Sequence, residues 1–517
     1  MKPARLFFVL PFILLALRGE AGNFSLSEPM QPPRATQVIA RRGASGQAPE
    51  NTRAALDRCI ADGFEWAEVD VRLTKDGQHV LAHDSKITGA TNDTRVVNEH
   101  TLEELRQMDP GSAFAARYAG ERILPLPDCL RLAKGRLNLC LDCKAVNPEQ
   151  LAREILDAGM ENQVVVYGDL AVLARVARAG NEKVATMAKW HPGMDIASWS
   201  RTNGLAAVEI NADEATPDAV KSFHTAGLKV QTKNLGEWDK PAFWDKSFAA
   251  GVDWIQTDLA EEVLARELWR AAGTRPVRIS CHRGANRYAP ENTLPAFEKA
   301  IRLGVDFVEF DVRTTSDGKF YLLHDARLDR TTTGQGPISG VAAADVATLS
   351  AGLKFGRPFA DIKVPPLDDF LGATAGRIDL YFDAKAIPPE ALSEAVERFK
   401  MAERTVVYQS ADYLLRLKAI NPRIRALPPL SDPAQIPQLA ANLKPYAVDA
   451  AWKILSKDVI AQCHAAGILV FSDALGAHER IEDYQQAMDW GIDLIQTDFP
   501  LRVLRAIELR AAGPGRR

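Results

Sequence analysis

Short apolar runs alternate with amphipathic stretches along most of the chain. After Asn292, the residues Phe297, Ala300 and Ile301 share one helical face, which predicts a helix from about Asn292 to Leu303 with Asn292 as its N-cap. The apolar runs of the second half, each of a length typical of a buried strand, are Arg278–Ser280, Phe307–Arg313, Phe320–His324, Ile378–Phe382, Thr405–Tyr408, Ala447–Ala450, Ile468–Ser472 and Leu494–Thr497. Eight strand–helix units in about 235 residues are typical of a (β/α)₈ barrel.

A set of motifs in the first half of the chain recurs in the second half, each offset by 241 residues over about a hundred residues. The second copy reads His282-Arg283-Gly284, Pro290-Glu291-Asn292-Thr293, Glu309-Phe310-Asp311, His324-Asp325 and Asp383-Ala384-Lys385. The first copy reads Arg41-Arg42-Gly43, Pro49-Glu50-Asn51-Thr52, Glu68-Val69-Asp70, His83-Asp84 and Asp142-Cys143-Lys144. The sequence therefore predicts an α/β protein made of two tandem barrels, residues 35–272 and 277–512, joined near residues 271–276.

Carboxylates of the second copy are expected to gather at one end of its barrel. Alternate residues of a strand share a face, so Glu309 and Asp311 point the same way, as do Asp383 and Lys385. The C-terminal strand ends of a parallel barrel meet at one mouth. Three carboxylates held together repel one another unless a cation lies among them, and oxygen ligands suit Ca²⁺ or Mg²⁺. The predicted metal ligands are Glu309, Asp311 and Asp383.

Two histidines are expected beside this cluster. His282 and His324 are candidates for a general acid and a general base at neutral pH, with their order left open. Arg283 and Lys385 supply fixed positive charge suited to a phosphate group. A cation, paired imidazoles and phosphate-binding cations together indicate cleavage of a phosphodiester.

These motifs resemble the glycerophosphodiester phosphodiesterase family. The resemblance rests on the motifs above and on the run from Leu328 to Gly334, and it extends in the second copy from His282 to about Pro500. It implies the phospholipase-C-like variant of the barrel and hydrolysis of a small glycerophosphodiester to glycerol 3-phosphate and an alcohol, with a divalent cation. Carried over by position, His282 and His324 are the acid/base pair, Arg283 and Lys385 bind phosphate, and Glu291 supports the site.

Both copies depart from the family pattern. The family usually has Glu where this chain has Asp383 and Asp142, from which we expect altered affinity for the metal rather than its loss. In the first copy Arg41 replaces the histidine, and an arginine does not exchange protons at neutral pH. The first copy retains Arg42, Glu68, Asp70, His83, Asp142 and Lys144. It is therefore a site that binds without cleaving, a duplicate kept for stability, or a site in which Arg41 stabilises developing charge.

The N-terminal residues predict export. Lys2 and Arg5 precede an apolar run from Leu6 to Leu17, and small residues follow, so residues 1–21 are interpreted as a signal peptide. The run is too short to span a bilayer, which takes about twenty residues. We expect a mature protein in the periplasm or outside the cell, without stable membrane insertion.

Composition narrows the function further. The chain has 46% apolar and 25% charged residues, which is ordinary for a globular protein, and a formal net charge of −4 gives no basis for nucleic-acid binding. Cys140 and Cys143 lie three apart on a predicted strand, so they face opposite ways and suit neither a disulfide nor a shared metal. The alternatives to the expected activity are action on a lysophospholipid or sugar phosphodiester, and a non-catalytic phosphodiester-binding protein.

Overall fold

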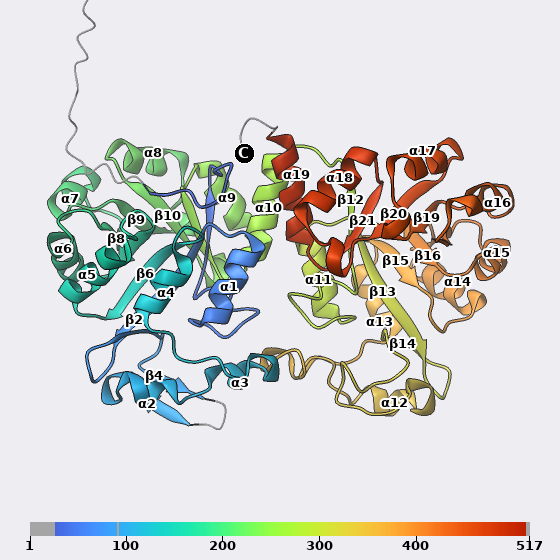
Figure 1. Cartoon of the computed structure of the whole chain (residues 1–517), viewed down its shortest axis with the longest axis horizontal. Coiled ribbons are helices and arrows are strands. Elements are labelled where there is room, and N and C mark those ends of the chain that lie inside the picture. Colours follow the sequence, from blue (N-terminus) through green and yellow to red (C-terminus); the bar gives the residue numbers. More distant parts are fainter. Residues whose placement is uncertain (1–25, 90–92, 513–517) are drawn as a thin grey trace, which may run out of the picture.

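The computed structural model describes residues 26–89 and 93–512, and the predicted signal peptide lies outside these residues. Two barrels stand side by side, each a ring of parallel strands surrounded by helices (Figure 1). The prediction of two tandem (β/α)₈ barrels is confirmed. Within the described ranges, no helix combines the length and the apolar character that crossing a membrane demands.

Barrel one is a closed ring of eight parallel strands, because β1 pairs with both β11 and β2. Its strands are β1 (Gln37–Ala40), β2 (Trp66–Leu73), β6 (Asn138–Ala145), β7 (Val164–Tyr167), β8 (Ala185–Lys189), β9 (Ala207–Asn211), β10 (Lys229–Asn234) and β11 (Trp254–Thr257). Its outer helices are α1 (Arg53–Asp62), α4 (Leu126–Ala133), α5 (Pro148–Ala158), α6 (Leu170–Ala179), α7 (Ile196–Asn203), α8 (Pro217–Thr225), α9 (Pro241–Ala250) and α10 (Ala260–Ala272).

Barrel two repeats this ring with one interruption. Its strands are β12 (Arg278–Cys281), β13 (Phe307–Thr314), β15 (Asp379–Asp383), β16 (Thr405–Tyr408), β17 (Arg425–Leu427), β18 (Pro429–Leu430), β19 (Ala447–Ala450), β20 (Leu469–Asp473) and β21 (Leu494–Thr497). Its outer helices are α11 (Leu294–Arg302), α13 (Leu367–Thr374), α14 (Pro389–Arg398), α15 (Ala411–Ile420), α16 (Ile436–Asn442), α17 (Lys457–Ala465), α18 (Ile481–Trp490) and α19 (Pro500–Ala511). Pro428 separates β17, which pairs with β16, from β18, which pairs with β19.

One predicted barrel strand of the second copy is wrong. The run Phe320–His324 forms β14 (Phe320–Leu322), which pairs antiparallel with β13 and does not belong to the parallel ring. The fifth position of the ring is filled by β17 and β18, which the sequence prediction missed. The pair is short and broken by a proline, so it lacks the continuous apolar run by which the other strands are recognised.

A long excursion leaves each barrel on the side of the C-terminal strand ends. In barrel one it carries β3 (His79–Leu81), β4 (Lys86–Thr88), β5 (Thr94–Val96), α2 (Leu102–Arg106) and α3 (Pro110–Phe114), and in barrel two it carries β14 and α12 (Ala343–Val346). The two excursions lie along the same side of the molecule (Figure 1). They touch where the Arg117 guanidinium lies 4.2 Å from the ring centre of Phe355.

The two barrels share one continuous apolar core. Helix α10, which ends barrel one, packs against α19, which ends barrel two. Leu264 and Leu268 of α10 belong to the same buried cluster as Leu504 and Ile507 of α19. A buried ion pair crosses the same boundary, because Arg34 Nε lies 2.9 Å from Glu508 Oε1.

Candidate active site

Three carboxylates of barrel two meet at the mouth of the barrel. Glu309 and Asp311 lie on β13, and Asp383 ends the neighbouring strand β15, level with Asp311 in the strand register. One oxygen of each carboxylate lies within 4.8 Å of the others. Glu309 and Asp311 are buried, and among the described residues Asp311 Oδ1 accepts no hydrogen bond, although the Lys385 amine lies 3.3 Å away. Burial, reinforced by Asp311 and Asp383, raises the pKa of Glu309 well above its usual range. These oxygens fit a hard divalent cation, whose charge offsets their repulsion.

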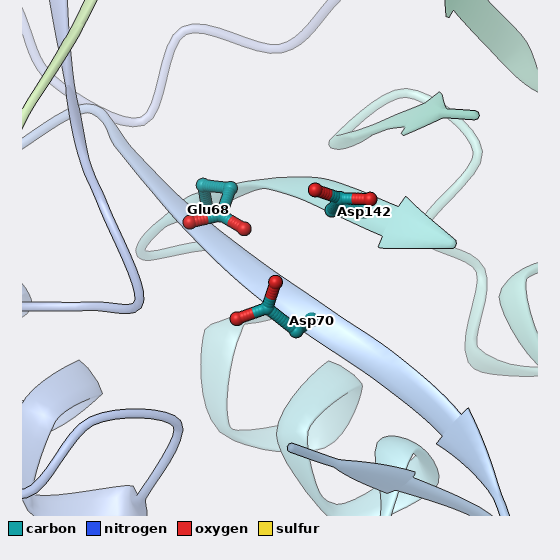
Figure 2. Close-up of side chains that lie close together, drawn as sticks. All are labelled: Glu68, Asp70 and Asp142. Carbon is teal, nitrogen blue, oxygen red and sulfur yellow. The ribbon is translucent and has the colours of Figure 1, made fainter. Parts of the chain in front are cut away.

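Barrel one holds the matching cluster. Figure 2 shows Glu68 and Asp70 on β2 and Asp142 on the neighbouring strand β6. One oxygen of each of these carboxylates also lies within 4.8 Å of the others. Burial, and then the charges of Asp70 and Asp142, raise the pKa of Glu68. Both copies therefore keep the same potential cation ligands.

Asn292 fixes the orientation of Asp311. Its side-chain amide donates to Asp311 Oδ2 at 2.8 Å, and the backbone N–H of Asp311 donates to Asn292 Oδ1 at 3.1 Å. Asn292 adopts φ 55, and Thr293 is the residue that precedes helix α11. The prediction that Asn292 caps this helix is wrong, because its side chain is already engaged by the carboxylate.

Each histidine of barrel two is paired with a carboxylate. His282 Nδ1 lies 2.8 Å from Asp498 Oδ1, and His324 Nδ1 lies 2.7 Å from Asp325 Oδ1. Burial alone would raise the pKa of Asp498, but the hydrogen bond and charge of His282, together with Asn286 and Arg283, lower it overall. An ionised carboxylate at Nδ1 leaves Nε2 of the ring available for proton transfer.

His324 reaches the mouth by a route that the sequence prediction did not contain. It follows the antiparallel strand β14, which runs back along β13, and the N–H of Leu323 donates to the carbonyl of Asp311 at 3.0 Å. The guanidinium of Arg313 donates twice to the carbonyl of His324, at 3.0 and 2.7 Å. The hairpin thus returns His324 to the level of the carboxylates.

The predicted phosphate-binding cations lie against the cluster. Lys385 Nζ pairs with Asp383 and lies 3.3 Å from Asp311 Oδ1, and Arg283 Nε lies 3.7 Å from Asp311 Oδ2. Glu291 accepts from Arg283 at 3.0 Å and pairs with Arg330, which also binds Asp325. Glu291 and Arg330 therefore connect the loop that carries Arg283 with the residue that orients His324.

The mouth of barrel one has ion pairs equivalent to those of barrel two, but not the link that Arg330 makes between Glu291 and Asp325. Arg41 Nη1 lies 3.1 Å from Asp258 Oδ1, where barrel two pairs His282 with Asp498. His83 Nδ1 lies 2.8 Å from Asp84 Oδ1, and Lys144 Nζ lies 2.6 Å from Asp142 Oδ2. Arg42 pairs with Glu50 at 2.7 Å. The Asp84 side chain is 76% exposed, against 32% for Asp325, which Arg330 covers.

The sequence prediction missed Asp498, Arg313 and Arg330 as parts of the site. A signal for Asp498 was present, since both copies end their last strand with Ile-Gln-Thr-Asp, at Ile255–Asp258 and Ile495–Asp498. The Thr-Asp pair at the end of this strand recurs in both copies, and in barrels of this kind the catalytic residues lie at the C-terminal ends of the strands. Arg330 lay in a motif that was recognised, but its partners are set only by the folded excursion.

The fold and the groups at its mouth define an enzyme of the phosphoric diester hydrolase class. The model of the glycerophosphoryl diester phosphodiesterase family matches residues 42–144 and 282–502, and the chain belongs to this family.

Relatives of known name match about one barrel's length. A glycerophosphodiester phosphodiesterase of Caldanaerobacter subterraneus subsp. tengcongensis is 27% identical over 238 residues, 44% of this chain and 97% of the relative. A glycerophosphodiester phosphodiesterase of Bacillus subtilis is 27% identical over 244 residues, 42% of this chain and 82% of the relative. The crystal structure of a glycerophosphodiester phosphodiesterase from Agrobacterium tumefaciens, 29% identical, covers 44% of this chain and 99% of its own, with a TM-score of 0.42.

Proposed function

We propose that barrel two hydrolyses glycerophosphodiesters to glycerol 3-phosphate and an alcohol with the aid of a divalent cation, Ca²⁺ or Mg²⁺. The observation that carries this proposal is the pairing of His282 with Asp498 and of His324 with Asp325 beside the three carboxylates. The curated relatives named above are glycerophosphodiester phosphodiesterases, which supports the same substrate class.

In the proposed reaction, the side chains of barrel two divide the work between binding and proton transfer. Arg283 and Lys385 bind oxygens of the substrate phosphate. One imidazole of the pair His282 and His324 removes a proton from the nucleophile, and the other protonates the oxygen of the leaving alcohol. The nucleophile is water, or the glycerol hydroxyl of the substrate, in which case water then opens the cyclic phosphate to give glycerol 3-phosphate. Glu309, Asp311 and Asp383 hold the cation, which when bound supplies a Lewis acid that offsets charge on the phosphoryl oxygens.

The test is release of glycerol 3-phosphate from glycerophosphocholine by the full chain, with added Ca²⁺ or Mg²⁺. Replacing His282 with alanine removes one proton-transfer group, so we expect kcat to fall by about 10²- to 10⁴-fold. The matched variant His83→Ala, in barrel one, is expected to keep the original rate. Equal loss in both variants would contradict the assignment of hydrolysis to barrel two. No turnover of any glycerophosphodiester by the intact chain would instead favour a phosphodiester-binding protein.

Export of the protein is part of the same proposal and rests on residues 1–21 of the sequence. Its test is cell fractionation followed by mass spectrometry of the N-terminus. We expect a mature chain that begins after about residue 21 in the periplasm or the medium. An uncleaved chain retained in the cytoplasm would contradict export and leave the hydrolytic proposal intact.

A further inference from the structure

The mouth of barrel one contains a polar cavity of about 110 Å³. It is lined by the carboxylate cluster and by cationic and amide side chains, among them Arg41, Lys144, Gln231 and Lys233. The shared strand registers allow each of these positions to be compared with barrel two. The comparison shows that the two mouths have become electrostatically different.

Lys233 is the clearest of these differences. It lies on β10, level with Gln256 of β11, whereas barrel two places Asp473 level with the corresponding Gln496. Among the described residues, no carboxylate pairs with Lys233 and no acceptor binds its amine. An unpaired cation that lines a cavity favours an anionic ligand.

A second difference neutralises a carboxylate of the cavity. Glu209 on β9 lies 3.4 Å from Lys189 Nζ, so its charge is offset within barrel one. Barrel two has Asp449 at this position, level with Pro429, and Asp449 is bound by the hydroxyl of Tyr381 at 2.9 Å. Of the side chains lining the cavity, three are cationic and four are carboxylates. The matching positions of barrel two hold one cation, Lys385, and five carboxylates, Glu309, Asp311, Asp383, Asp449 and Asp473.

Gln231 supplies an independent observation that points to a ligand. Its side chain is 1% exposed and lines the cavity. Its amide Nε2 donates to Glu209 Oε2 at 3.1 Å and to Gln256 Oε1 at 3.4 Å, but no group within residues 26–89 and 93–512 donates to its carbonyl Oε1. Barrel two carries Phe471 in the same register. A buried acceptor without a partner is destabilising, and a ligand hydroxyl that donates to it removes that cost.

Arg41 sets the chemistry of this mouth. Its guanidinium pairs with Asp258 as His282 pairs with Asp498, so it adds a fixed positive charge where barrel two has a titratable ring. A guanidinium keeps its protons at neutral pH and therefore does not act as a general base. The mouth is thus suited to hold a phosphorylated ligand without cleaving it.

We infer that the mouth of barrel one is a divalent-cation-dependent binding site for a phosphate monoester that carries hydroxyl groups. A monoester bears a charge of about −1.5 to −2 at pH 7, whereas a diester bears a single charge. The mouth of barrel one is more positive than that of barrel two by three unit charges, which favours the more negative ligand. One charge comes from Arg41 in place of a neutral histidine, and two come from Lys233 in place of Asp473. Lys233 and Arg41 would neutralise the phosphate, and Gln231 would accept from a hydroxyl.

The test is calorimetric titration of the full chain with sn-glycerol 3-phosphate in the presence of Ca²⁺ or Mg²⁺. The chain carries His282→Ala and Asp383→Ala, which disable barrel two, so the result does not depend on hydrolysis there. We expect binding that requires the cation and that weakens at least tenfold in Lys233→Met. The control Lys221→Met removes an exposed lysine of α8 and is expected to bind as before.

Two further titrations separate the parts of the ligand. Gln231→Leu places an apolar residue where barrel two tolerates Phe471, and we expect it to weaken glycerol 3-phosphate but not inorganic phosphate. Glycerophosphocholine is expected to bind more weakly than glycerol 3-phosphate. The inference is overturned if the monoester does not bind, if Lys233→Met binds it unchanged, if Gln231→Leu weakens both ligands equally, if the diester binds more tightly, or if the barrel-two variant still hydrolyses the diester.

Discussion

At the scale of single residues, the two mouths differ in the partner of one equivalent aspartate, which is Arg41 in barrel one and His282 in barrel two. Asp258 and Asp498 both follow the last strand of their barrel, and both bind the side chain at the His-Arg-Gly position of their copy. A guanidinium and an imidazole therefore occupy the same ion pair. Arginine in place of histidine thus keeps the contact with the carboxylate and lacks a group that exchanges protons at neutral pH.

Asp498 should accordingly act as the positioning residue of His282. Replacing it with asparagine removes the charge that fixes the ring, and we expect kcat for glycerophosphocholine to fall by at least tenfold, in the range of partners that orient a histidine. Its partner Asp258→Asn, in barrel one, is the matched control and should leave kcat unchanged. The pH profile of kcat separates this positioning role from a merely structural one. An unchanged profile and kcat would refute the role.

The sequence predicted most of the side chains that lie together at the mouth of barrel two, but not those that orient them. The repeated carboxylates, histidines and cations stand at fixed offsets, and strand alternation brings Glu309 and Asp311 to one face. The prediction for Asn292 is wrong because its local sequence resembles a helix cap. Its positive φ of 55° and its hydrogen bonds to Asp311 depend on the tertiary structure, which the local sequence does not reveal. Hydrogen-bond partners that lie 19 or more residues apart, such as Asn292 and Asp311, produce no periodic pattern in the sequence.

At the scale of elements, the hairpin of β13 and β14 decides where His324 lies. The sequence assigned this run to the barrel wall, yet it doubles back and still delivers His324 to the mouth. The prediction of eight strands was right in number because the missed pair β17 and β18 replaced the misassigned one. Strand length and apolar character predict a strand, but not its direction or its neighbour.

The segment between β20 and α18 predicts a pH dependence of stability. Glu479 accepts from the N–H of Asp498 at 2.9 Å and from Thr497 Oγ1 at 3.2 Å, and burial raises its pKa to about 7. In the unfolded chain its pKa is about 4.3. The folded protein therefore binds more protons between these values, and its free energy of unfolding falls as pH rises from about 4.5 to 7.

Glu479→Gln removes this titration, so we expect a shallower fall in the free energy of unfolding over that range. Urea denaturation at several pH values between 4.5 and 8 measures it. Glu482→Gln, an exposed carboxylate on α18, is the matched control and should keep the slope of the original protein. If Glu479→Gln also keeps that slope, Glu479 is ionised throughout and the prediction is wrong.

At the scale of the whole molecule, barrel one contacts the loop that carries His282. Arg58 of α1 donates to the carbonyl of Arg287 at 3.1 Å, and its guanidinium lies 5.0 Å from the ring centre of the buried Tyr288. Arg287 in turn lies over Phe499, the neighbour of Asp498, at 3.8 Å. A residue of one barrel thus supports the loop on which the other barrel's proposed chemistry depends.

Replacing Arg58 with methionine should therefore lower turnover in barrel two. The hydrogen bond is worth about 0.5–1.5 kcal/mol. If its loss displaces the loop and raises the activation barrier by that amount, kcat falls roughly two- to tenfold. Steady-state kinetics on the full chain measure it. Arg53→Met, on the exposed side of the same helix, is the control and should leave kcat unaltered. A fall in thermal stability with unchanged kcat would show that Arg58 only holds the barrels together.

The apolar core shared by α10 and α19 makes each barrel depend on the other for the burial of one flank. Once Leu264, Leu268, Leu504 and Ile507 were buried together, neither half could be deleted without exposing the apolar flank of the other. The buried flank constrains the outline of barrel one and leaves the side chains at its mouth unconstrained by that contact. Helices α1 and α10 of barrel one are therefore expected to stay under the constraints of the neighbouring barrel, whatever ligand its mouth binds.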